Sequence, residues 1–133
     1  MRIVCDNNVW YGIAEGTVTL DLETNQYYGT FINIVEFVAD ETKAKSPDDL
    51  RKLKAAVKNM QKFSSGIVFL DPLSYVGRYL YKSTFQDSRE TDSEELYLKL
   101  IAYAEGKLPK LHGRTVDDFR TVSYTHLTLP TKA

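Results

Sequence analysis

The sequence predicts an α/β domain in which a mainly parallel sheet is flanked by helices. Short β-branched and apolar runs alternate with longer stretches of helical periodicity, a pattern typical of parallel strands joined by helices. Polar residues follow the apolar runs directly, as expected where parallel strands end at ligand-binding loops. The 133 residues, of which 43% are hydrophobic, suffice for one packed core.

The first predicted strand covers residues 2–5 and stops at the polar cluster that begins with Asp6. Asp6 is therefore expected at the carboxyl end of this strand. A short helix over residues 9–14 should follow and end near Gly16, because glycine readily adopts the left-handed conformation at helix ends. Two further stretches fit a strand and a helix equally well: 17–22 and 27–28.

Residues 30–40 predict a helix that is apolar on nearly all sides. Only Asn33, Glu36 and Asp40 interrupt it, and their spacings of three and four place them on one stripe. A buried carboxylate without a partner costs several kcal/mol, so Glu36 requires a metal ion or a dense set of hydrogen bonds. In the alternative interpretation, Asn33 and Asp40 serve only to hydrogen-bond Glu36.

The next helix has a strong start signal, with Ser46 as N-cap, Pro47 at the first helical position and two acids in the first turn. It should end near residues 64–66. Its apolar face is predicted to be Leu50, Leu53, Val57 and Met60. Beside that face runs a basic stripe: Arg51, Lys54, Lys58 and Lys62. The stripe fits a solvated helix face or a surface that contacts phosphates.

Later elements continue the alternation. Residues 67–70 predict a second buried strand, and residues 71–80 a helix. After a polar loop, Thr91 or Ser93 should cap a helix that ends at Gly106. Residues 115–120 predict the start of one more helix.

The end of the chain differs in character from the rest. Residues 123–133 contain no charged residue except one lysine and resemble translated sequencing-adapter read-through. We therefore expect a domain over residues 1–122, truncated at its C-terminus, and a non-native tail over residues 123–133. A short natural strand is the alternative for the tail.

Composition excludes several protein classes. The single cysteine, Cys5, allows no internal disulfide or cysteine metal cluster and is expected to be a buried strand residue. A formal net charge of -1 gives no global basic field for nucleic acid. Apolar runs are too short for a membrane helix, and an acidic residue comes too early for a signal peptide. We expect a cytoplasmic protein without a membrane partner.

Two segments resemble PIN (PilT N-terminal) domains. Residues 1–9, Met-Arg-Ile-Val-Cys-Asp-Asn-Asn-Val, are similar to the family's opening strand and loop, in which Thr or Ser and then Asn or Ser follow the Asp. Here Asn7 takes the middle position, which keeps a hydrogen-bonding side chain and loses the hydroxyl. Residues 31–37 are similar to the family's second element, an apolar helix that carries one glutamate, here Glu36.

The resemblance implies a PIN-like three-layer fold and a metal-dependent ribonuclease. Asp6 and Glu36 would hold Mg²⁺ or Mn²⁺, and Asn8 would bind the attacking water or hold Asp6. A divalent cation lowers the pKa of water and neutralises phosphate charge, and Mg²⁺ prefers carboxylate oxygens. RNA is the expected substrate. The family also leaves open an antitoxin protein as partner of a toxin, and a homodimer.

The rest of a PIN site is not recognisable in this sequence. The family brings a third acidic residue at the start of an alanine-rich helix, and often a fourth. Asp92 is a candidate substitute, although acids favour the first turn of any helix. Truncation at the tail explains the missing acid more simply, so we expect the chain as given to be an inactive nuclease.

Two other function classes stay open. The first is a PIN-like module that binds nucleic acid or protein without cutting. The second is a receiver-like phosphoacceptor domain, suggested by the acidic ends of the strands before Asp6 and Asp71. Receivers typically have two adjacent acids in the first loop, whereas asparagines follow Asp6, and a receiver would leave Glu36 unexplained.

Overall fold

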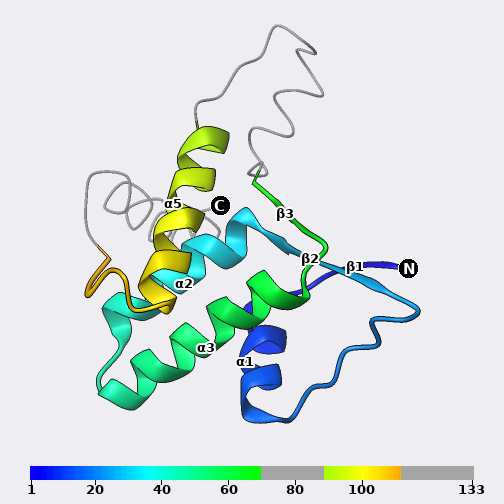
Figure 1. The fold of residues 1–133 in the computed structure, drawn as a ribbon, viewed down its shortest axis with the longest axis horizontal. Helices are drawn as coiled ribbons and strands as arrows, with labels where there is room; N and C mark the ends of the chain where they lie inside the picture. The colour runs from blue at the N-terminus through cyan, green and yellow to red at the C-terminus, as the bar shows by residue number, and fades with distance from the viewer. Residues whose placement is uncertain (70–88, 112–133) are drawn as a thin grey trace, which may run out of the picture.

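A computed structural model describes residues 1–69 and 89–111 of the chain (Figure 1). This part contains a parallel sheet and helices that alternate with its strands, which confirms the predicted α/β class. The elements in chain order are β1 (Arg2–Val4), α1 (Asn7–Glu15), β2 (Gln26–Thr30), α2 (Phe31–Lys43), α3 (Pro47–Phe63), β3 (Gly66–Val68) and α5 (Arg89–Ala104).

The described sheet has three parallel strands in the order β1-β2-β3. Ile3 pairs with Tyr27, and Gly29 pairs with Ile67. This order matches one half of the Rossmann-type sheet, whose strands run 3-2-1 on one side. Receiver domains place their first strand between the second and third, so the receiver interpretation does not fit this sheet.

Local signals place the helix ends close to where the sequence predicts them. Asp6 caps α1, and Gly16 ends it with a φ of 79°, a left-handed conformation that favours glycine. The Ser46 hydroxyl accepts a hydrogen bond from the Asp49 backbone N–H at 3.2 Å, and Pro47 is the first residue of α3. These contacts involve neighbours in sequence, which is why the sequence reveals them.

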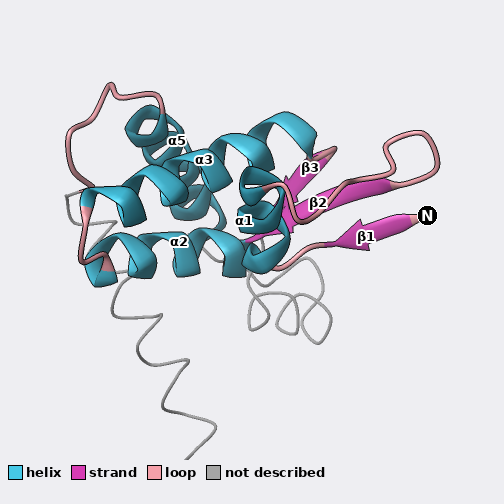
Figure 2. Ribbon diagram, turned by 90° about the horizontal axis from the view of Figure 1, so that it is seen from below, coloured by secondary structure: helices cyan, strands magenta, loops and turns pink. Residues whose placement is uncertain are grey.

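The helices form the core by packing on one another and on β2. α1 lies alongside α3, and α5 packs against α2 and α3 (Figures 1 and 2). This arrangement is compatible with a three-layer α/β fold. The predicted apolar face of α3 is buried at Leu53, Val57 and Met60 and partly buried at Leu50. Cys5 is buried, as predicted, but it lies directly after β1 and not within it.

Some boundaries differ from the prediction. β3 is shorter than expected, because it ends at Val68, whose side chain is 48% exposed. α5 begins at Arg89, so Thr91 and Ser93 lie inside its first turns, and their prediction as caps is wrong. Of the two ambiguous stretches, 27–28 belongs to β2, and 17–22 contains no strand or helix.

Other predictions fall on residues outside the described ranges: the helix over 71–80, Asp71, the helix start over 115–120 and the tail over 123–133. In the described ranges, no helix combines the length and the apolar character that crossing a membrane requires.

Candidate functional site

The candidate site lies at the ends of β1 and β2, where each strand is followed by a helix. Asp6 lies two residues after β1 and caps α1, and α2 begins directly after β2. Because β1 and β2 are paired in parallel, both helix starts lie at the carboxyl edge of the sheet. Ligands of open α/β sheets bind at this edge.

Asp6 is exposed, and its orientation is set by the backbone that follows it. Its Oδ1 accepts a hydrogen bond from the Asn8 backbone N–H at 2.8 Å. The sequence predicted that Asn8 holds Asp6 or a water molecule with its side chain. Asn8 does hold Asp6, but through its main chain, and Asn8 itself is exposed.

Glu36 lies on the solvent side of α2, one turn after Asn33. Partial loss of hydration raises the pKa of its carboxyl group most, the charges of Asp40 and Asp6 raise the pKa further, and Lys43 lowers it. Of the two acidic charges, that of Asp40 has the larger effect on Glu36 and that of Asp6 the smaller. The Glu36 carboxylate forms no hydrogen bond with a residue of the described ranges.

The predicted polar stripe of α2 is therefore divided among three environments. Asn33 is buried at 2% exposure, Glu36 is exposed, and Asp40 is half-buried. The expectation that Asn33 and Asp40 hydrogen-bond Glu36 is wrong, because each has another partner. The helix turns by about 100° per residue, so neighbours on a broad stripe can face different surroundings.

Asn7 and Asn33 form a buried amide pair that the sequence analysis missed. The Asn33 Nδ2 donates to Asn7 Oδ1 at 2.6 Å, and the Asn7 Nδ2 donates to the Asn33 carbonyl oxygen at 3.4 Å. The Asn33 Oδ1 in turn accepts from the Thr30 backbone N–H at 2.8 Å. The pair ties the start of α1 to the start of α2.

A sequence signal for this pair existed. Asn7 directly follows Asp6, and Asn33 interrupts an otherwise apolar helix. Buried amides require hydrogen-bond partners, so two unexplained amides at two strand ends of one sheet edge are natural partners. Because Asn7 neighbours Asp6 and Asn33 lies one turn before Glu36, the pair also fixes the relative position of the two carboxylates.

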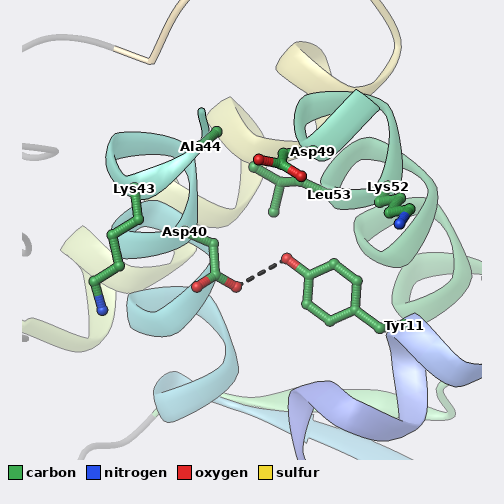
Figure 3. A pocket seen from close by; sticks show the side chains of 7 residues that line it. All are labelled: Tyr11, Asp40, Lys43, Ala44, Asp49, Lys52 and Leu53. Carbon is green, nitrogen blue, oxygen red and sulfur yellow. Dashed lines mark hydrogen bonds between the residues drawn. The ribbon is translucent and has the colours of Figure 1, made fainter. Parts of the chain in front are cut away.

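A pocket of about 230 Å³ adjoins this site between α1, α2 and the start of α3. Figure 3 shows the Tyr11 hydroxyl directed at Asp40, to which it donates a hydrogen bond of 2.8 Å. Asp49 faces the same space from α3, and the ammonium groups of Lys43 and Lys52 point away from the hydroxyl. The pocket is lined by two acids, Asp40 and Asp49, and by two lysines, Lys43 and Lys52.

Burial and the acidic groups near Tyr11 raise the pKa of its hydroxyl group. Burial raises the pKa of its hydroxyl most, followed by the hydrogen bond to Asp40 and by the charges of Asp40, Asp49 and Glu36. Burial likewise raises the pKa of Asp40, although the Tyr11 hydrogen bond and Lys43 lower it. A bound cation stabilises carboxylates that are held together in this way, because it relieves their mutual repulsion.

The chemistry of the donors suits a hard divalent cation, which prefers carboxylate oxygens. Asp6 and Glu36 can each present one carboxylate to an ion at the sheet edge. The described ranges hold no group of three or more His, Cys, Asp or Glu placed to bind one metal ion. Asp92, on α5, is therefore not brought to Asp6 and Glu36 as a third acid.

No protein-family model, curated protein or solved structure matches this chain.

Proposed function

We propose that this chain is a divalent-metal-dependent ribonuclease of PIN type, with Asp6 and Glu36 as ligands of Mg²⁺ or Mn²⁺. The observation that carries the proposal is the position of Asp6 at the start of α1 and of Glu36 in the second turn of α2, because these two helices follow two neighbouring parallel strands. The raised pKa of Glu36, to which Asp6 contributes, supports their proximity.

Each residue of the site has a separate task in this proposal. A bound divalent cation would supply charge neutralisation for the phosphate and activation of water. Asp6 is held in place by the Asn8 backbone N–H, so it loses little conformational freedom when it binds an ion. Asn8 presents an exposed amide beside Asp6 that can donate to a phosphate oxygen. Asn7 and Asn33 hold the two helix starts together.

Metal binding provides the most direct test of this site. Titration with Mn²⁺ should broaden the NMR signals of residues around Asp6 and Glu36 and should raise the thermal midpoint, because an ion that binds the folded state stabilises it. Asp6→Asn and Glu36→Gln should each abolish both effects with almost no change in side-chain volume. Glu23→Gln, which removes an exposed carboxylate elsewhere, should leave both effects intact.

RNA cleavage is the second test. With only two carboxylates as ligands, we expect little or no Mg²⁺- or Mn²⁺-dependent cleavage by the chain as given, and loss of any residual activity in Asp6→Asn and Glu36→Gln. Broadening centred on another part of the chain would contradict the metal assignment. Cleavage that survives both substitutions would contradict the catalytic assignment. Retention of RNA together with no Mn²⁺ binding at Asp6 and Glu36 would replace the nuclease by the binding-module interpretation.

A further inference from the structure

A basic groove lies between α3 and the end of α5, on elements other than those that carry Asp6 and Glu36. Its volume is about 480 Å³. The described residues that line it are Pro47, Leu50, Arg51, Lys54, Ala55 and Lys58 of α3 and Ala104 of α5. Three of these seven residues are cations and none is acidic. Three cations of the predicted basic stripe of α3 thus line a concave surface. This favours the interpretation as a phosphate-contacting surface over that of a solvated helix face.

The cations form a straight row. From Arg51 to Lys62 they follow one another at steps of three, four and four residues. An α-helix rises about 1.5 Å per residue, so neighbouring charges are about 5 to 6 Å apart along the axis and the row is about 16 Å long. A compact anion would require cations that converge on one point, whereas a linear row fits a chain with regularly repeated negative charges.

Most of these charges have no ion-pair partner among residues 1–69 and 89–111. Arg51 forms an ion pair with Asp48, but Lys54, Lys58 and Lys62 form no ion pair with other described residues. Lys54 is also held in position, because its Nζ lies 4.8 Å from the centre of the buried Tyr103 ring. On another face of the same helix, Lys52 lies 3.6 Å from the Asp48 carboxylate. As far as the described residues show, the cations of α3 without an ion-pair partner therefore lie in the basic stripe.

We propose that this groove binds the phosphate backbone of single-stranded nucleic acid without reading its sequence. Phosphate contacts position a nucleic acid, and base contacts provide its specificity. Proteins that bind single strands combine a positive groove with exposed aromatic rings for stacking. No aromatic residue lines the groove within the described ranges, so the contacts should be electrostatic and tolerant of sequence. The inference is independent of the metal site and is tested without metal.

The test measures binding of labelled oligouridylate and oligoadenylate by fluorescence anisotropy in EDTA at several salt concentrations. Both should bind, with similar affinity. Each phosphate contact with a single strand contributes a slope of about 0.7 in log affinity against log salt, or about eightfold in affinity near 0.05 M salt. Lys54→Gln with Lys58→Gln should therefore reduce the slope by about 1.4 and the affinity by about 60-fold.

The matched control removes the same two charges outside the groove, in Lys43→Gln with Lys52→Gln, and should keep the salt slope. The single variant Lys58→Gln should fold normally, because Lys58 is exposed. It should show half the change in salt slope, so a loss caused by misfolding of the double variant can be recognised. Because the assay is run in EDTA, binding to this groove is measured separately from the metal-dependent ribonuclease proposal. Equal losses in the two double variants, no binding at low salt, or stronger binding of polyglutamate than of RNA would each overturn the proposal.

Discussion

Replacement of Asn33 by alanine tests the contact that joins the two halves of the candidate site. Asn33 is 2% exposed, and its side chain donates to Asn7 Oδ1 at 2.6 Å and accepts from the Thr30 N–H at 2.8 Å. Each hydrogen bond contributes about 1 kcal/mol net, and a buried polar atom left without its partner costs about 1 to 3 kcal/mol. Alanine regains about 0.5 kcal/mol through its higher helix propensity.

The expected result is a loss of about 3 kcal/mol in the free energy of unfolding. This is a large part of the total stability of a typical domain, which is roughly 5 to 15 kcal/mol. Urea unfolding measures this loss directly. In calorimetry it corresponds to a fall of about 12 °C in the thermal midpoint for a domain of this size. Asn33→Ala should also weaken Mn²⁺ binding at temperatures where the variant remains folded, because Asp6 and Glu36 lose their common support.

A double-mutant cycle with Asn7→Ala distinguishes the amide pair from two independent effects. Because the two side chains share one hydrogen bond, the double variant should lose about 1 to 2 kcal/mol less than the sum of the single variants. Additive losses, or a loss below about 1 kcal/mol for Asn33→Ala alone, would show that the buried pair does not couple α1 to α2.

Three further predictions concern charge and packing. Glu36 has a raised pKa in the folded protein, so protonation of its carboxyl group stabilises the fold, and this stabilisation is lost as the pH rises from the ordinary pKa of 4.5 through the raised value. Glu36→Gln should therefore raise the calorimetric midpoint at pH ~7 and change it little at pH ~3. Equal shifts at both pH values would contradict this. Tyr11→Phe removes the hydrogen bond to Asp40 and should lower the free energy of unfolding in urea by about 2 kcal/mol. Tyr28→Phe loses only an exposed hydrogen bond and should change this free energy little. Similar losses in the two variants would show that the Tyr11–Asp40 hydrogen bond does not stabilise the fold. Leu53→Ala removes a core side chain that is 1% exposed and should cost about 3 kcal/mol in the same assay, and a loss below about 1 kcal/mol would show that the α3 face is loosely packed.

The sequence predicted those parts of the fold that depend on near neighbours. The Ser46 cap and Pro47 mark the start of α3, and the glycine at position 16 marks the end of α1, because each signal acts within four residues along the chain. The β-branched run before Asp6 likewise predicted a strand and the position of Asp6 after its end, but the prediction that this strand is buried is wrong, because the Val4 side chain is 66% exposed. Alternation of such signals was enough to predict a parallel α/β sheet.

The tertiary structure decided which of these local features meet. The order β1-β2-β3 depends on how α1 and α3 pack across the sheet, and no local pattern specifies it. Asn7 and Asn33 are separated by 26 positions, so their hydrogen bond exists only because two strand ends lie side by side. Helical periodicity placed Glu36 on a polar stripe, but its exposure depends on which neighbouring elements cover that stripe. Contacts between distant residues are set by the packing of whole elements, and periodicity along one element carries no information about its neighbours in space.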